Sequence, residues 1–265
     1  MKRLLVVALL LAAGCSNNPY RQAQPPQQQV GESLPSGDPK PGDAKTRAKA
    51  HTDLGMLYYQ TAQMATALDE ARVALAADAG YAPAYNLLGL VHMYLNEHAE
   101  ADAAFQRSIS LAPNDPETNN NYGWYLCTRG REQDGIRLLM VAVKNPLYQT
   151  PTRPYTNAGL CALRLNDLAA AEDYFRKAVQ ADRSNVQALY QLASVNYQRG
   201  NYFEAKRYIG AALDLQDPNA ETLWLAVRVE RKLGDRKEET RYANQLRRSF
   251  SGSPEHQLLT KGQYE

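Results

Sequence analysis

The stretch APAYNLLGLVHMYLNEHAEADAAFQRSISLAPND, residues 82–115, carries a pattern that recurs along the chain. In it, Gly89 is followed after twelve residues by Ala101, after four more by Phe105 and after three more by Ser108. The first of these columns repeats at intervals of 34, 34, 36, 34 and 34 residues: Gly55, Gly89, Gly123, Gly159, Ala193 and Val227. The other three columns keep the same intervals. A period of this length is typical of solenoids built from stacked supersecondary units.

The period and its columns resemble the tetratricopeptide repeat, in which each unit is a pair of antiparallel helices. Small residues at two positions let the paired helices cross closely, and a large apolar residue fills the space between them. We therefore expect an all-α fold, a right-handed superhelix of six tetratricopeptide repeats over residues 45–249, with repeats that start at 48, 82, 116, 152, 186 and 220. Asn166-Asp167, Gly200-Asn201 and Gly234-Asp235 supply turn residues between the helices of the last three repeats.

Two segments interrupt or end this pattern. Residues 144–154 contain three prolines and the two-residue excess between the third and fourth repeats, so we expect an elbow there. The elbow would separate two groups of three repeats within one superhelix. Residues 250–265 follow the last repeat as a tail or cap, in which residues 255–259 form a short capping turn.

The first residues read as a targeting signal. Met1-Lys2-Arg3, the apolar run 4–11 and the small residues 12–14 before Cys15 resemble a bacterial lipoprotein signal peptide. The resemblance implies that residues 1–14 are removed and that Cys15 carries the lipid. Because Ser16, and not aspartate, follows the cysteine, it also implies an outer-membrane lipoprotein that faces the periplasm. The alternative is an ordinary secretory peptide with an incidental cysteine.

A polar segment follows the signal. Residues 17–42 contain six prolines and five glutamines and almost no residue that would form a core. We expect residues 15–44 to be a disordered tether, with a root-mean-square span of about 30 Å. A docking peptide for another domain is the alternative, but a PxxP core flanked by basic residues is missing.

Composition and motifs exclude several classes of function. Without Lys2 and Arg3, 28 basic residues balance 28 acidic ones, so no nucleic-acid partner is indicated. The sequence holds no Gly-rich phosphate loop ending in Gly-Lys-Ser/Thr, no His-Glu-x-x-His and no Gly-x-Ser-x-Gly. The four histidines are scattered along the repeats and the chain ends. We therefore expect no enzyme, no catalytic residue, no metal, no cofactor and no small-molecule substrate.

The first helices of such a superhelix line a concave groove that holds peptides or helices of partners. At inward positions of the first two repeats we place Met56, Tyr59, Asn86, Leu90, Met93 and Tyr94. Methionine and tyrosine are adaptable contact residues, so this set is predicted to be a partner groove. The alternative is that individual members pack against the neighbouring repeat or an N-terminal segment.

A second face lies on the sixth repeat, and two cysteines lie in the middle of the chain. Trp224, Arg228, Arg231 and Lys232 share a helix face, which is either a basic surface or the polar cap of the solenoid. Cys127 and Cys161 are 34 residues apart on first helices of adjacent repeats. They are predicted to form a disulfide in an oxidising periplasm, the alternative being two buried free thiols.

Residues 119–127 (NNNYGWYLC) together with residues 157–161 (NAGLC) resemble the type IV pilus biogenesis lipoproteins PilF and PilW. The likeness runs from the signal peptide through all the repeats. It implies an outer-membrane pilotin that binds the pilus secretin and promotes its localisation and multimerisation, without active site or cofactor. Within the motif, Asn120 and Trp124 fall at groove-facing positions, although the asparagine run also suits a helix N-cap.

Two rival functions fit the same architecture. One is a lipoprotein scaffold that regulates peptidoglycan synthases or hydrolases, and the other is a subunit of an outer-membrane assembly complex. Loss of twitching with cell shape and envelope intact would separate the pilus function from both.

Overall fold

The structure, a computed structural model, describes residues 41–146 and 148–264. The predicted signal peptide, Cys15 and all but the last residues of the predicted tether lie outside these residues. The described part of the chain folds into thirteen helices and contains no strand. The helices are α1 (Pro41–Gln60), α2 (Met64–Ala77), α3 (Ala82–Tyr94), α4 (His98–Leu111), α5 (Pro116–Thr128), α6 (Glu132–Lys144), α7 (Thr152–Arg164), α8 (Leu168–Ala181), α9 (Val186–Gln198), α10 (Tyr202–Leu215), α11 (Ala220–Leu233), α12 (Arg236–Ser249) and α13 (Pro254–Lys261).

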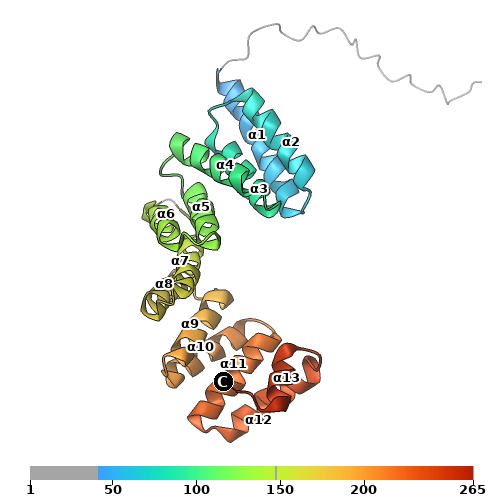
Figure 1. The fold of residues 1–265 in the computed structure, drawn as a ribbon, viewed down its shortest axis with the longest axis vertical. Coiled ribbons are helices and arrows are strands. Elements are labelled where there is room, and N and C mark those ends of the chain that lie inside the picture. Colours follow the sequence, from blue (N-terminus) through green and yellow to red (C-terminus); the bar gives the residue numbers. More distant parts are fainter. Residues whose placement is uncertain (1–40, 147, 265) are drawn as a thin grey trace, which may run out of the picture. The chain divides into compact units, whose positions relative to one another are not determined.

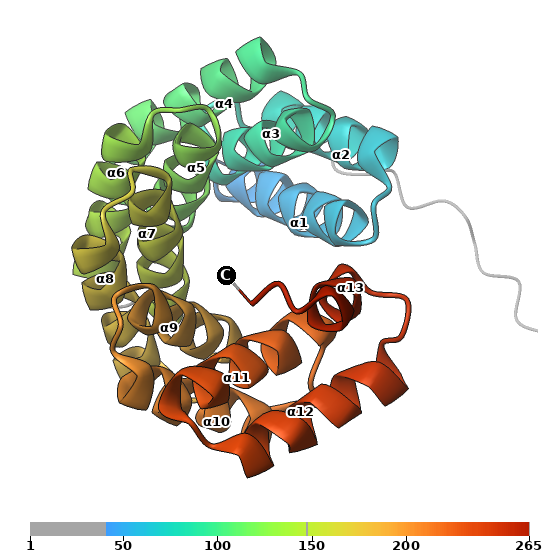
Figure 2. The same cartoon turned by 60° about the horizontal axis from the view of Figure 1, so that its bottom comes forward.

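The first twelve helices form six consecutive antiparallel hairpins, from α1–α2 to α11–α12 (Figure 1). The hairpins stack into the predicted right-handed superhelix. Figure 2 shows that the first helix of each hairpin lies on the inside of the curve and the second on the outside. The inner helices are therefore α1, α3, α5, α7, α9 and α11.

The glycine column is explained by close contact within each hairpin. A Cβ atom on Gly89 would lie 2.6 Å from the ring of Phe105, and one on Gly159 would lie 2.5 Å from the ring of Phe175. Both phenylalanine rings are fully buried, as are the small residues that follow them in the pattern, Ser108 and Ala178. The periodic residues are thus the packing residues of the hairpins, as predicted.

Each hairpin turns through one residue with a left-handed backbone: Ala62, Asn96, Gly130, Asn166, Gly200 and Gly234. Asparagine and glycine adopt this conformation readily, which explains the turn residues seen in the sequence. Alanine does not, and a left-handed conformation costs it about 1–2 kcal/mol. The first hairpin therefore has the least favourable turn.

The first described helix includes the last residues of the predicted tether. Helix α1 is described from Pro41, so residues 41–44 are helical. Asp43 in the first turn adds a favourable interaction with the helix dipole.

The predicted elbow is the connection between α6 and α7, where Pro151 directly precedes α7. The chain does not divide there, because α6 and α7 stay in contact and α5 also contacts α7. All six hairpins and α13 belong to one compact unit.

The C-terminal segment is a cap. In place of the short turn expected at residues 255–259, the eight-residue helix α13 packs on α11 and α12. Its N-cap is Ser253, whose hydroxyl accepts the backbone N–H of His256 at 3.1 Å. Leu259 of α13 is buried against Leu223 and Leu246, so α13 covers apolar surface that a seventh repeat would otherwise cover.

Candidate partner groove

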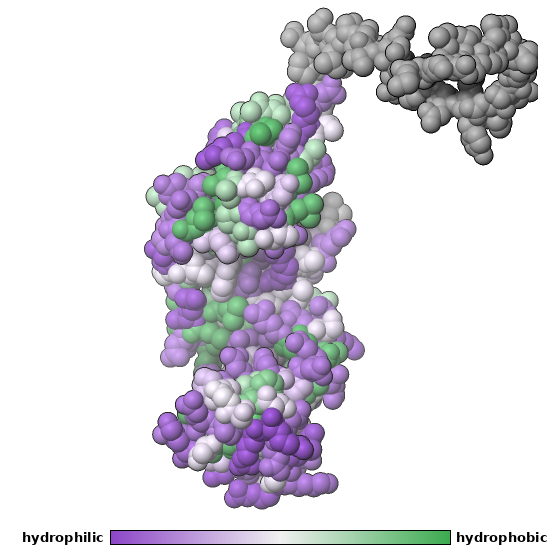
Figure 3. All heavy atoms as spheres, turned by 90° about the vertical axis from the view of Figure 1, so that its right-hand side faces the viewer, coloured by the Kyte–Doolittle hydropathy of each residue, from purple (hydrophilic) through white to green (hydrophobic). Residues whose placement is uncertain are grey.

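A groove of about 840 Å³ runs along the inner helices α1, α3, α5 and α7. Seven of the eight residues predicted to line a partner groove line this one: Met56, Tyr59, Asn86, Leu90, Met93, Asn120 and Trp124. On the face of the molecule seen in Figure 3, hydrophobic side chains form small patches among hydrophilic ones. Because it gathers seven of the predicted residues, the groove is the candidate partner site.

Tyr94 is the exception among the predicted groove residues. Its side chain is 55% exposed, and it is absent from the groove lining. Successive helical residues are rotated by about 100°, so Met93, which lines the groove, directs its neighbour away from it. The prediction for Tyr94 is wrong for this reason.

The apolar side of the groove is continuous with the core. Leu90 is only 8% exposed and packs in a cluster with Phe105, against which Met56, Tyr59 and Met93 are partly buried. Burial raises the pKa of the Tyr59 phenol, which stays a neutral hydrogen-bond donor at physiological pH. Leu90 is mainly a core residue, whereas the methionines and Tyr59 offer surface to a partner.

The polar side of the groove is a row of linked asparagines. Asn121 donates its amide to Asn86 Oδ1 at 3.2 Å, and Asn120 donates to Asn121 Oδ1 at 3.1 Å. Asn157 in turn donates to Asn120 Oδ1 at 3.0 Å. These bonds connect α3, α5 and α7, so the asparagines hold the inner helices in register as well as lining the groove.

The N-cap role considered for the asparagine run belongs to another residue. Asp115 is the N-cap of α5 and accepts the backbone N–H of Thr118 at 2.7 Å. Asn119 instead donates to the carbonyl oxygens of Pro113 and Asp115, both at 2.8 Å, and so secures the turn before α5. Asn120 is therefore free of capping, and its side chain, 1% exposed, links α5 to α7 at the wall of the groove.

Sequence reasoning missed the part of the groove that the fourth repeat supplies. Thr156, Asn157 and Arg153 of α7 line it, together with Asn185 before α9. Thr156 stands at the repeat position of Asn120, and this positional equivalence would have identified it. Asn185 donates to Thr152 Oγ1 at 2.8 Å and to Thr156 Oγ1 at 3.1 Å, so further polar links join α7 to the residue before α9.

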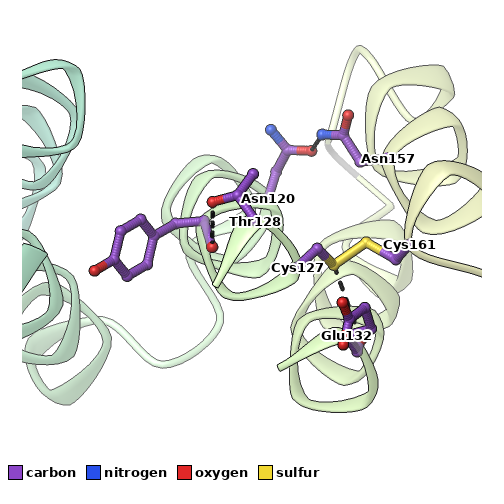
Figure 4. Close-up of a disulfide and its surroundings, with 7 residues drawn as sticks. Asn120, Cys127, Thr128, Glu132, Asn157 and Cys161 are labelled. Atoms are coloured by element: carbon purple, nitrogen blue, oxygen red, sulfur yellow. Dashed lines mark hydrogen bonds between the residues drawn. A yellow bond between two sulfur atoms is a disulfide. The ribbon is translucent and has the colours of Figure 1, made fainter. Parts of the chain in front are cut away.

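Cys127 of α5 and Cys161 of α7 form a disulfide with a Cα–Cα distance of 5.6 Å. Both cysteines are fully buried. Figure 4 shows the disulfide beside the hydrogen bond between Asn120 and Asn157. A covalent and a polar link thus join the same two inner helices, α5 and α7.

Part of the face of the sixth repeat is covered. Trp224 of α11 is 7% exposed, and Tyr264 stacks on it with a centroid distance of 5.4 Å. Arg228 donates to the carbonyl oxygen of Tyr264 at 2.9 Å. Tyr264 thus covers Trp224 and contacts Arg228, whereas Arg231 and Lys232 of the same face remain exposed, so both roles predicted for this face stay open.

Two further observations concern the described residues. Within residues 41–146 and 148–264, no group of three or more His, Cys, Asp and Glu side chains is arranged to hold a metal ion. None of the helices described above is both long and apolar enough to cross a membrane.

Residues 82–115 and 152–185 match tetratricopeptide repeat models, in agreement with the hairpins of the fold. The chain therefore contains tetratricopeptide repeats, whose stacks present extended concave surfaces to protein partners.

More specific similarity points to two homologues, PilF and PilW. The chain is 28% identical over 208 residues to the type IV pilus assembly protein PilF of Pseudomonas aeruginosa, which covers 78% of this chain and 82% of the relative. The solved structure of P. aeruginosa PilF superposes with a TM-score of 0.76 at 26% identity, covering 83% of this chain and 99% of PilF. PilW, a widely conserved type IV pilus biogenesis factor, gives a TM-score of 0.73 at 26% identity, covering 80% of this chain and 98% of PilW.

Proposed function

We propose that this protein is an outer-membrane pilotin lipoprotein of type IV pilus biogenesis. Its groove binds the pilus secretin and promotes localisation and multimerisation of the secretin in the outer membrane. The observation that carries the proposal is an open groove over α1, α3, α5 and α7, in a chain homologous over about four fifths of its length to proteins of type IV pilus assembly and biogenesis.

The chemistry of the groove suits a peptide or helix of a protein partner. Met56 and Met93 provide flexible apolar contacts, and Trp124 provides a large rigid one. On the polar side, the partly exposed amide of Asn121 is available to backbone groups of a bound segment. Apolar anchors beside neutral hydrogen-bonding groups are typical of sites that recognise polypeptide segments.

The lipid at Cys15 supplies placement in this proposal. Stable anchoring takes at least two membrane signals, which the acyl chains of a bacterial lipoprotein satisfy. Binding a secretin subunit to a membrane-confined escort raises the local subunit concentration without any new contact. Ring assembly depends steeply on that concentration.

The first experiment deletes the gene in a piliated host and measures heat-stable secretin multimers of the outer-membrane fraction on an unheated gel. We expect the multimers to be lost or mislocalised, and the full chain to restore them. A Cys15→Ser variant is expected to bind secretin in solution but to fail in localisation. Multimers that are unchanged on deletion would overturn the pilotin function.

A second experiment tests whether the secretin binds in the groove. The double variant Met56→Glu, Met93→Glu adds carboxylates that reach water in the empty groove but would be desolvated under a partner. We expect secretin binding to weaken by more than about tenfold, with unchanged helical content. Tyr94→Glu is the matched control, because Tyr94 neighbours Met93 but is exposed and does not line the groove. Equal binding by the double variant and the control would place the site elsewhere.

A further inference from the structure

The chain end returns to the concave face after α13. Gly262 has a left-handed backbone with φ 68°, and its N–H donates to the Leu259 carbonyl at 3.2 Å. The next residue, Gln263, donates its N–H to the Leu258 carbonyl at 3.0 Å. This glycine-centred ending stops the helix and reverses the chain. Figure 2 shows the described segment after α13 running toward the inside of the curve.

The reversal brings Tyr264 onto α11, where it is held by an aromatic residue and two arginines. Its ring lies 5.4 Å from the ring of Trp224, with the planes at 27°. The guanidinium of Arg231 lies 3.9 Å from the centre of the Tyr264 ring. Arg228 donates to the Tyr264 backbone carbonyl at 2.9 Å, and its guanidinium lies 4.4 Å from the ring of Tyr197 in α9.

Together, Tyr197, Trp224, Arg228 and Arg231 form a cradle for Tyr264. The cradle occupies repeat positions that line the open groove elsewhere. Trp224 and Arg228 stand in α11 where Asn86 and Leu90 stand in α3. Asn86 and Leu90 line the open groove, so Tyr264 lies where a bound partner segment would lie at the other end of the concave face.

The geometry also shows which contacts are easily exchanged. Helix α13 is fixed by Leu259, which is 4% exposed, and by its Ser253 cap. Tyr264 lies beyond the Gly262 reversal and is only partly buried. Its ring can therefore leave while α13 stays in place. Arg231 also forms an ion pair with Glu239, with 2.9 Å between Nη1 and Oε1. Arg231 therefore stays in position when Tyr264 leaves.

We propose that Tyr197, Trp224, Arg228 and Arg231 form a second peptide-binding subsite, which accepts an aromatic side chain and the carbonyl beside it. Tyr264 is its resident occupant, which the aromatic residue of a partner peptide displaces. The subsite needs neither the secretin nor the groove over α1, α3, α5 and α7. Failure of either proposal would therefore leave the other one untouched.

Tryptophan signals provide the test, because the chain has two tryptophans and only Trp224 belongs to the cradle. In a spectrum of indole N–H groups, Tyr264→Ala is expected to move the Trp224 signal and to leave the Trp124 signal unchanged. Addition of the synthetic peptide LLTKGQYE, residues 258–265, is expected to return the Trp224 signal of this variant toward its wild-type position. Tyr264→Phe should resemble the wild type, because phenylalanine keeps the ring and the carbonyl.

Displacement is measured on the isotope-labelled wild-type chain with the same unlabelled peptide. The tethered tail has an effective concentration on the order of millimolar, so several millimolar peptide is needed. We expect the Tyr264 amide signal to move to an unbound position while the Trp224 signal stays, because one tyrosine replaces another.

Two controls make the test decisive. A peptide with alanine at the tyrosine should leave the Trp224 signal of Tyr264→Ala unmoved, and Arg228→Ala in that variant should weaken binding of LLTKGQYE by about tenfold. The proposal is overturned if LLTKGQYE does not move the Trp224 signal, if the alanine peptide moves it equally, or if the wild-type tail never leaves.

Discussion

The two ends of the concave face use the same repeat positions in opposite ways. Over α3 and α5 these positions hold Asn86, Leu90 and Asn120, and the groove is open. On α11 they hold Trp224 and Arg228, and the chain's own end covers them. Repeat position thus determines that a side chain faces inward, while its chemistry and the path of the C-terminal segment determine whether a partner can reach it.

The two ends are also held together differently. The centre of the open groove is fixed by the Cys127–Cys161 disulfide and by neutral amides. The sixth repeat relies on its cap and on charges: Glu230, 3% exposed, accepts a 2.8 Å bond from Lys206, which lies 3.3 Å from Asp235. The bond to Glu230 is the main reason why the pKa of Lys206 is raised. Different perturbations should therefore weaken each end.

Removing the disulfide should have the largest effect, and it acts on the open end. The disulfide closes a loop with a sequence separation of 34 residues, and on the chain-entropy model its loss lowers the free energy of unfolding by about 4 kcal/mol. We expect the double variant Cys127→Ala, Cys161→Ala to unfold at a clearly lower urea concentration than the oxidised wild type. Reductant should lower the wild-type midpoint and leave the double variant unchanged. Equal midpoints for the variant and the oxidised wild type would contradict this prediction.

Truncating the cap should have a smaller effect at the other end. Leu259→Ala removes a side chain that is 4% exposed and packs on Leu223, at a cost of about 2–3 kcal/mol. Hydrogen exchange should show faster opening of α11 and α12, with α5 and α7 unaffected. Leu215→Ala, at a residue 49% exposed, is the control and should change little. Loss of protection throughout the chain would mean that the two ends unfold together.

Protonation of Asp235 should have the smallest effect. The pKa of this carboxyl is lowered first by the Glu238 backbone N–H that it accepts as N-cap of α12, and then by Lys206. A lowered folded-state pKa adds stability above the unfolded-state pKa of about 3.9, and this stability is lost as the pH falls through the folded-state value. Asp235→Asn keeps a capping side chain and should unfold with a shallower pH dependence below pH 4. An identical pH dependence of the urea midpoint in both proteins would refute it.

The repeat pattern predicted most of the fold from local evidence. Gly89 and Phe105 contact each other within one hairpin, so their spacing in the sequence encodes their contact directly. The left-handed turn residues Asn166 and Gly200 are also local signals, because the residue type itself favours this backbone conformation. Tyr94 was placed wrongly because a repeat pattern gives the rotation of a helix only to within about one residue, or about 100°.

Other features depended on contacts between repeats. The repeat spacing of the two cysteines predicted a disulfide but left free thiols as an alternative, and the packing of α5 on α7 brings their Cα atoms to 5.6 Å. The bond between Asn120 and Asn157 likewise needs the two helices in register. Neither residue type reveals its partner by spacing alone.

The sequence by itself determined the hairpins, their number and which helices face inward, because the packing residues of each hairpin recur with one period and act over short sequence distances. Only the tertiary structure decided which part of the inner face is open. The contact between Arg228 and Tyr264 joins residues 36 positions apart through a cap outside the repeats, and it depends on the chain reversal at Gly262. A period cannot encode such a contact, because it occurs once.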